Sequence, residues 1–371
     1  MPSTDPRAKS YKFVSLHPGG KKTSGEVNGH EKWTDLTGAL TITIKALTPL
    51  HIASGMTVAA EDLREREDIA WPNDFTEPLV LEHYHSAGIR VIPATSLKGS
   101  IRSVVEAISQ SCVSKSKGVS ENLKGSRRDS SPFKNSRECR AKIGAPLNLC
   151  PACRLFGAMG FEGRVRFSDA PQTAGGGLIA FRPAPNQPNR DFSHEHPIHT
   201  DKYYQTEGNN NRQIKGRKFY LHYDQPEDQR VKYEPTEVCA HESIFTFKIE
   251  FESLKNDELG LLMVALGQGD GVKVFKIGGS KPFGYGTVEV SNCSGIVWNE
   301  ASRKEQCLSW DEKTVEPQDW ERLSKDVIEA ARASDLIIVG QLNDLKAIFN
   351  PQAQYSAEDV ARWRKGEDKY E

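Results

Sequence analysis

Two kinds of hydrophobic periodicity alternate along the chain, and their order restricts the possible folds. Apolar residues occupy every second position in GALTITIKA (38–46), in GRVRFSDA (163–170) and in SIFTFKIEFES (243–253), as is typical of strands with one buried face. Helical spacing marks IPATSLKGSIRSVVEAISQS (92–111) and NDELGLLMVALG (256–267), and VKVFKIGGSKPFGYGTVEVS indicates two strands joined by a glycine loop. The order strand, helix, strand, strand, helix, strand predicts an α+β, ferredoxin-like (RRM-like) domain.

This domain is expected over residues 36–295, between two terminal segments. Residues 1–35 are polar and rich in Gly and Lys without an apolar period, which predicts an extension that is flexible or loosely docked. Residues 296–371 are expected to form a C-terminal helical tail. We expect Thr95 or Ser96 to cap the first helix and Asn256 to cap the second.

Two insertions are expected within the domain. Residues 113–153 include a charged, Ser-rich stretch that is a poor core former, and 171–240 mix Pro, Asn, Gly and His without a clear period. Within the second insertion, GRKFYLHY (216–223) is compatible with one arm of a β-hairpin. We therefore predict that both insertions lie at the surface, the second as a long protrusion.

The charge of the chain is unevenly distributed. The net charge is −1 over 371 residues, but between Ser96 and Arg166 there are 14 Lys and Arg against 5 acids. From Asp311 onward, 14 acids face 9 bases. A basic centre beside an acidic tail predicts a polyanionic partner. No signal-peptide pattern and no run of about 18 apolar residues is present, so we expect a cytoplasmic protein with no membrane partner.

Four of the seven cysteines fall within 42 residues. They are Cys112, Cys139, Cys150 and Cys153, the last two forming a Cys-x-x-Cys. An odd cysteine number without a signal peptide favours reduced thiols, and four such donors favour a structural zinc that would stabilise the 113–153 insertion as a zinc knuckle. A redox pair and unligated core thiols are alternatives, and His83, His85 or a histidine within 194–199 is a possible substitute ligand.

Three further stretches suggest contacts with a ligand. In SLKGSIR, Lys98 and Arg102 lie four residues apart near a helix start that favours anions, although such a start is often merely solvated. In the loop GGSKPFGYG, Lys281 offers charge and two aromatic residues offer stacking faces, but a hairpin turn has the same composition. The acid-rich loop after His51 contains three aspartates able to position a divalent metal, or simply to be solvated; they are Asp62, Asp68 and Asp74.

Together these stretches resemble a known family. LHIASG, IPATSLKGSIRS, CPACRLFG with GRVRFSDA, and GGSKPFGYG occur in the order found in the RAMP superfamily (repeat-associated mysterious proteins). Over residues 38–290 the chain is similar to the backbone subunits of type III CRISPR effector complexes, which act in antiviral defense. The resemblance implies an RRM-like domain that coats guide RNA beside other effector subunits, with 171–240 as a thumb-like hairpin that interrupts the duplex of guide and target RNA.

The resemblance also implies roles for particular residues. Guide phosphates would be held by Ser96, Lys98, Gly99 and Arg102, near His51 and Ser54 of the first motif and with Arg164 and Arg166 facing the RNA. The glycine loop would pack near the same RNA through Gly278, Gly279, Lys281, Phe283, Gly284, Tyr285 and Gly286.

Many backbone subunits of this family cleave target RNA with an aspartate in the loop after the first strand. By similarity this role falls to Asp62, which is followed by Leu63, or else to Asp68. With a divalent cation such as Mg²⁺, a ribose 2′-hydroxyl would attack its adjacent phosphate after one target nucleotide is flipped out.

Two other functions are compatible with the same motifs. The chain could be a non-catalytic RNA-binding subunit, or a stand-alone endoribonuclease that matures guide RNA with His51 or His194 as acid and base. The long insertion and the acidic tail exceed a minimal backbone subunit, which suggests a specialised position in the complex.

Overall fold

The computed structural model describes most of the chain. The described residues are 10–22, 30, 32–113, 138–141, 148–183, 204–207, 211–223, 233–308, 317–356, 358 and 360. His194 and most of the 113–153 insertion lie outside the described residues, whereas its cysteines Cys139, Cys150 and Cys153 lie within them.

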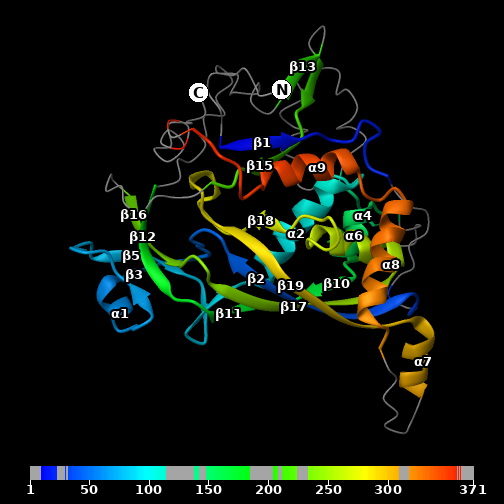
Figure 1. The fold of residues 1–371 in the computed structure, drawn as a ribbon, viewed down its shortest axis with the longest axis horizontal. Helices are drawn as coiled ribbons and strands as arrows, with labels where there is room; N and C mark the ends of the chain where they lie inside the picture. Colours follow the sequence, from blue (N-terminus) through cyan, green and yellow to red (C-terminus); the bar gives the residue numbers. More distant parts are fainter. Residues whose placement is uncertain are drawn as a thin grey trace.

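An antiparallel sheet forms the centre of the described structure (Figure 1). Its strands lie in the order β18-β19-β2-β17-β11-β7-β6, and β10 also pairs with β17. The bounds are β2 (Leu36–Ala46), β6 (His85–Ser86), β7 (Ile89–Ile92), β10 (Val165–Phe167), β11 (Ala170–Ala174), β17 (Ile244–Leu254), β18 (Val274–Lys276) and β19 (Thr287–Trp298). The strands predicted from alternation are present, and the α+β class is confirmed.

The alternation in sequence becomes a difference between the two faces of this sheet. Ile42 of β2 is opposite Phe247 of β17, and both are buried, whereas the neighbouring Thr41 is partly exposed. Leu40 and Ile44 are fully buried on the same face. Burying one face of each strand in this way fixes the register, because a shift by one residue would expose the whole apolar set.

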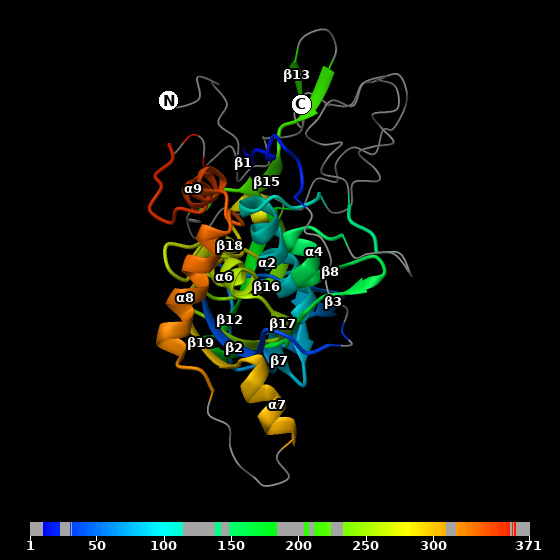
Figure 2. The same ribbon diagram turned by 90° about the vertical axis from the view of Figure 1, so that its right-hand side faces the viewer.

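Helices α2 (Ala94–Ile108), α4 (Pro151–Phe156) and α6 (Asn256–Ala265) pack beside this sheet and join its core (Figure 2). Both predicted helices are present, but they begin earlier than their predicted caps. The N-cap of α2 is Pro93, without a side-chain hydrogen bond. The N-cap of α6 is Lys255, whose amide donates to Glu258 Oε2 over 3.1 Å, so Asn256 is the first helical residue.

The C-terminal segment contributes α7 (Glu300–Leu308), α8 (Trp320–Ala333) and α9 (Val339–Ile348). Helix α8 packs closely on α6, since a Cβ at Gly260 would lie only 1.9 Å from the Val327 carbonyl oxygen. Glycine is therefore required at that crossing. Helix α9 packs on α2 and near β1, so α8 and α9 belong to the core, whereas α7 projects from it (Figure 2).

A second sheet lies beside the first in the order β3-β5-β16-β12-β4. Its strands are β3 (Ala53–Ala59), β4 (Ile69–Ala70), β5 (Leu79–His83), β12 (Gly177–Pro183) and β16 (Tyr233–Cys239), and α1 (Ala60–Arg64) follows β3 directly. Strands β12 and β16 come from the two ends of the 171–240 insertion. This sheet therefore joins that insertion to the acid-rich loop that follows His51.

The remaining strands form two-stranded ribbons: β1 (Tyr11–Val14) with β15 (Arg217–Tyr220), β13 (Tyr204–Glu207) with β14 (Asn211–Ile214), and β8 (Gly157–Ala158) with β9 (Phe161–Glu162). The hairpin of β13 projects from the body (Figure 1). The strand expected in GRKFYLHY is present as β15, and its partner is β1; within the described residues it pairs with no strand next to it in sequence. This pairing docks residues 11–14 of the predicted N-terminal extension onto the core, where Val14 is buried.

None of the helices in the described ranges has the length and apolar character required to cross a membrane.

Candidate nucleic-acid interface and metal centre

Four cysteine thiols meet beside the end of α2, although they come from three separate segments. Their sulfur atoms all lie within 4.8 Å of one another, and the Sγ atoms of Cys112 and Cys153 are 3.5 Å apart. Cys139 and Cys150 complete the cluster, and all four are buried. Zinc–sulfur bonds of about 2.3 Å place the sulfurs of a tetrahedral site about 3.8 Å apart. The cluster therefore has the donors and the spacing to hold a metal ion such as zinc.

Basic groups surround these thiols. Lys21 Nζ lies 3.6 Å from Cys139 Sγ, and Arg102 Nη2 lies 3.5 Å from Cys153 Sγ. A hydrogen bond with Cys112 lowers the pKa of Cys150 to about 6. Nearby positive charge and hydrogen bonding both favour the thiolate, which is the form that binds a metal. Four converging thiols fit a metal better than a redox pair, which would use only Cys150 and Cys153.

Arg102, predicted to hold a phosphate, is engaged within the protein. Its Nε donates to Glu106 Oε1 over 2.8 Å, and its Nη1 donates to the Gly157 carbonyl oxygen over 3.0 Å. The first bond lies within α2, and the second joins α2 to Gly157, the last residue of the CPACRLFG motif. In this structure Arg102 therefore fixes the cysteine-bearing segment against the helix.

The other residues of the α2 motif leave a more open surface. Gly99 is exposed, and nothing lies within 4 Å of where its Cβ would be. Ser96 and Lys98 are partly exposed. Lys98 Nζ donates to the Val165 carbonyl oxygen over 3.3 Å, and burial together with the Arg102 charge lowers its pKa. The start of α2 thus offers a hydroxyl, an ammonium group and accessible backbone on one surface.

The glycine loop packs on the LHIASG segment. The amides of Gly279 and Gly286 donate to the carbonyl oxygens of His51 and Pro49, each over 2.9 Å. Gly278 has φ +83°, and a Cβ there would lie 2.3 Å from the His51 carbonyl oxygen. Only glycine permits this approach. Two of the four sequence motifs are therefore in direct backbone contact.

The aromatic residues of this loop point into the protein. Phe283 and Tyr285 are 7% and 2% exposed and pack with Val238 of β16, so the structure does not present their rings as stacking faces. Between them Gly284 adopts φ +87°. Lys281 is partly exposed, and burial lowers its pKa.

Lys276, just before the loop, carries a buried amino group that the sequence did not single out. Its Nζ donates to the Tyr285 carbonyl oxygen over 3.2 Å. Burial, and to a lesser degree the Lys281 charge, lowers the pKa of Lys276 to about 7. Lys276 therefore links the end of β18 to the backbone of the glycine loop at Tyr285.

The acid-rich loop places its aspartates in different surroundings. Asp62 is exposed in the first turn of α1, and Asp74 is exposed further along. Asp68 Oδ2 lies 2.5 Å from Arg90 Nη1, so its charge is neutralised by a buried arginine. Ser54 is partly exposed, and its Oγ accepts a hydrogen bond from the Met56 amide over 3.0 Å.

Arg90 bridges this loop to a buried carboxylate. Its Nε donates to Glu237 Oε1 over 2.8 Å; the Arg90 side chain is 3% exposed and that of Glu237 is fully buried. Burial opposes ionisation of Glu237, but the hydrogen bond with His85 and the charges of His85 and Arg90 outweigh it and lower the pKa to about 2. A Cβ at Gly177 would lie 2.2 Å from Arg90 Nη2, so glycine is needed beside the guanidinium.

Two buried histidines, His51 and His83, are hydrogen-bonded to Glu237. His51 is 1% exposed, and its Nδ1 donates to the Glu237 carbonyl oxygen over 2.8 Å. His83 Nδ1 accepts from the Ile52 amide over 3.2 Å, and burial lowers the pKa of His83 to about 3. Sequence reasoning missed Arg90 and Glu237 because 147 residues separate them and neither belongs to a local pattern.

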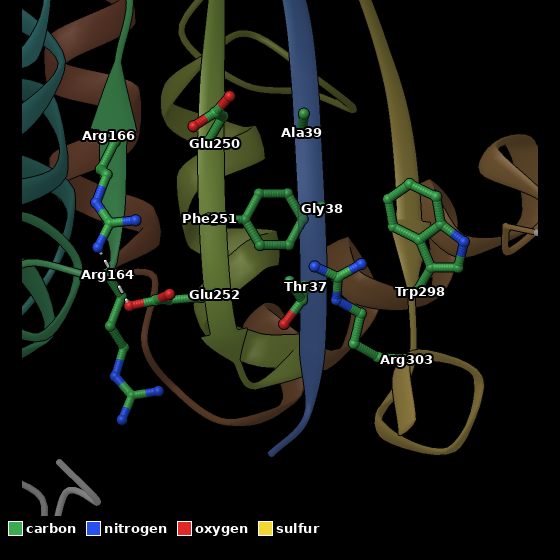
Figure 3. A pocket seen from close by; sticks show the side chains of 10 residues that line it. All are labelled: Thr37, Gly38, Ala39, Arg164, Arg166, Glu250, Phe251, Glu252, Trp298 and Arg303. Atoms are coloured by element: carbon green, nitrogen blue, oxygen red, sulfur yellow. Dashed lines mark ion pairs between the residues drawn. The ribbon is translucent and has the colours of Figure 1, made fainter. Parts of the chain in front are cut away.

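Arg164 and Arg166 line a pocket of about 280 Å³ across β10, β17, β2 and β19, with Trp298 and Arg303 on its other side (Figure 3). Arg164 is 5% exposed, and its Nη1 donates to the Ser253 carbonyl oxygen over 2.5 Å. Arg166 is 56% exposed but lies 3.3 Å from a carboxylate oxygen of Glu162 and 3.6 Å from one of Glu252. The pocket thus combines arginines with carboxylates and is not simply basic.

These contacts define a class of α+β protein. In it, a glycine loop packs on the turn that follows the first central strand, β2, and the helix α2 is hydrogen-bonded to the CPACRLFG segment and to β10. The chain belongs to the RAMP superfamily, whose sequence model matches residues 43–289. The resemblance inferred from the four motifs is thereby confirmed.

Among solved structures, the chain is similar to a chain in the cryo-EM structure of the type III-B Cmr-beta bound to cognate target RNA. The sequence identity is 14% and the TM-score is 0.31; the match covers 70% of this chain and 61% of that chain. This chain therefore spans less than two thirds of that chain's length. No curated protein sequence matches it significantly.

Proposed function

We propose that this chain is a guide-RNA-binding backbone subunit of a type III CRISPR effector complex, with target RNA and other effector subunits as partners. The observation that carries the proposal is the convergence of the family motifs. The glycine loop contacts the His51 backbone, and α2 is bonded to CPACRLFG through Arg102 and to β10 through Lys98. Four stretches that are distant in sequence thus meet in two pairs within a RAMP domain, the glycine loop with LHIASG and α2 with CPACRLFG and β10.

The sheet order supports a ferredoxin-like core. The strands β2, β10 with β11, β17 and β19, taken as first to fourth, lie in the spatial order fourth, first, third, second. Helix α2 follows the first strand and α6 follows the third. This is the split βαβ arrangement used by RRM-like domains.

Guide RNA would be held mainly by its phosphates. Ser96, Lys98 and Gly99 form the most accessible part of the motifs, and Lys281 adds a partly exposed ammonium group. Phosphate contacts give affinity without reading sequence, and base pairing by the guide would then supply specificity. The four buried thiols would bind a structural zinc that fixes the segment after α2 beside this surface.

Cleavage of target RNA by Asp62 is a further part of this proposal. Asp62 is exposed, and no side-chain hydrogen bond or ion pair involves it among the described residues, whereas Asp68 is paired with Arg90. However, the cysteine cluster is the one group of three or more metal-ligating side chains in the described ranges. Among the described residues the aspartates do not by themselves form a magnesium site.

That observation favours a second candidate, a non-catalytic RNA-binding subunit. A stand-alone endoribonuclease that uses His51 has less support, because the His51 side chain is buried and bonded to the Glu237 backbone.

The assembled complex tests these proposals. Lys98→Met should weaken guide-RNA binding and reduce its salt dependence, because one phosphate contact is lost. Lys248→Met, at an exposed lysine on β17, is the matched control. If both variants bind guide RNA with equal affinity, the start of α2 does not contact the RNA and this part of the proposal is wrong.

Cleavage is tested in the same complex with Asp62→Ala and Asp68→Ala. If Asp62 is catalytic, Asp62→Ala should abolish cutting at this subunit's position while guide binding persists. Unchanged cutting in both variants, or no cutting by the unmodified subunit, would leave the non-catalytic candidate.

A further inference from the structure

The ribbon of β1 and β15 brings together two segments that lie about 200 residues apart. Tyr11 is opposite Tyr220, and Phe13 is opposite Lys218. Cross-strand partners point to the same side of a ribbon, and side chains two apart share a face. One face therefore carries Tyr11, Phe13, Lys218 and Tyr220, which we call the aromatic–basic face.

The opposite face of the ribbon holds it against the core. Val14 is 1% exposed, and Phe219 packs edge-to-face on Phe349 with ring centroids 5.6 Å apart. Arg217 Nη2 donates to the carbonyl oxygens of Ser111 and Cys112, each over 3.0 Å. The ribbon is thus fixed to the end of α2 and to the cysteine-bearing segment, with the aromatic–basic face turned the other way.

The side chains of this face are arranged around the lysine. The Lys218 Nζ lies 3.8 Å from the ring centroid of Tyr11 and 4.8 Å from that of Tyr220. The rings of Tyr11 and Phe13 are 5.7 Å apart, and those of Tyr11 and Tyr220 are 6.2 Å apart. All four side chains are partly exposed. Three aromatic rings and one cation are therefore presented together.

The two chain segments that contain the strands of the ribbon carry charge of one sign. Residues 10–22 and 211–223 contain seven Lys and Arg and no Asp or Glu. Two of these bases are used internally, since Lys21 lies beside Cys139 and Arg217 is bonded to the α2 end. Lys12 and Lys22 are exposed. In Figure 1 the ribbon lies beside the projecting hairpin of β13.

We propose that the aromatic–basic face binds a single-stranded segment of RNA. Bases stack on tyrosine and phenylalanine rings without regard to sequence, and lysines between the rings attract the phosphates. An acidic peptide would satisfy the charge but would gain nothing from flat ring faces. This inference rests on the part of the proposed function that assigns RNA as ligand, and it is independent of cleavage.

The test measures binding of a short fluorescent oligouridine, which has no secondary structure, to the full chain. Tyr11→Ala with Tyr220→Ala should weaken binding at least tenfold, because each base–aromatic stack contributes about a factor of ten. Tyr11→Phe with Tyr220→Phe keeps the rings and should bind like the unmodified chain. Thermal unfolding of each variant checks that the ribbon remains docked.

Two matched controls separate this face from general effects. Lys12→Met lies on the same strand but on the other side of the ribbon, so it should weaken binding less than Lys218→Met. Trp33→Ala removes an aromatic ring that is 52% exposed elsewhere and should have no effect.

Equal losses for Lys12→Met and Lys218→Met, or unchanged binding after removal of both tyrosine rings, would overturn the proposal. Polyglutamate serves as the probe for an acidic peptide. If the variant without both tyrosine rings loses affinity for polyglutamate but not for the oligouridine, the proposal is overturned as well. If the unmodified chain binds no RNA at all, the proposed function itself fails, which is a different result from RNA binding that ignores this face.

Discussion

The Arg90–Glu237 pair makes a quantitative prediction about stability. Replacing Arg90 with Met removes the guanidinium 2.8 Å from a carboxylate that is fully buried. Removing one partner of a buried pair costs about 3–5 kcal/mol, because the other charge is left uncompensated. His85 and Arg66 still lie 3.2 and 3.7 Å from the same carboxylate oxygen, so we expect the lower end, about 3 kcal/mol.

The matched control is Arg166→Met. Arg166 also lies near two carboxylates, but its side chain is 56% exposed, and such surface pairs contribute less than about 1 kcal/mol. Urea unfolding of the purified full chain, followed by circular dichroism, gives both free energies by linear extrapolation. A cost for Arg90→Met no greater than that for Arg166→Met would refute the reasoning.

A double variant identifies the source of the cost. Arg90→Met with Glu237→Gln removes both charges, so it should be less destabilised than the sum of the two single variants. Simple additivity would mean that Arg90 acts through packing and not through the Glu237 charge.

Two further predictions follow from the buried groups. Metal analysis should find about one zinc per chain, lost in Cys150→Ser but retained in Cys293→Ser, a cysteine outside the cluster; no metal in the unmodified chain would contradict the zinc assignment. Stability should also fall in acid, because unfolded His83 protonates below about pH 6.5 whereas the folded side chain stays neutral down to about pH 3. Each such proton changes the unfolding free energy by about 1.4 kcal/mol per pH unit, and Glu237, with its pKa lowered to about 2, adds a loss in the same direction below about pH 4.5. His83→Gln should flatten the profile between pH 6.5 and 4.5, and an unchanged slope would show that His83 is not the group that titrates.

The elements predicted from the sequence are those whose cause is local. Alternation in GALTITIKA and SIFTFKIEFES places apolar side chains on one face of a strand wherever that strand lies, so β2 and β17 could be predicted without their partners. The same holds for α2. Its start was misplaced because Pro93, and not a hydroxyl side chain, precedes the helix.

The site was predictable only where neighbouring residues carry the chemistry. Cys150 and Cys153 form a recognisable knuckle, and Cys112 and Cys139 are close enough in sequence to be proposed with them. The use of Arg102 within the protein could not be predicted in this way. Whether an arginine meets a phosphate or a carbonyl depends on what packs against it, and here that is Gly157.

The sequence by itself determined the class of this protein, because periodicity and motif order depend on a few neighbouring residues and place the chain in the RAMP superfamily. The tertiary structure alone decided which groups remain accessible. In the folded chain Phe283 and Tyr285 are buried, and Asp68 forms an ion pair with Arg90. The pairing of β1 with β15 places the rings of the aromatic–basic face together. Those outcomes come from contacts between segments that are distant in sequence. Burial and charge pairing there depend on the whole fold and leave no periodic pattern to read beforehand.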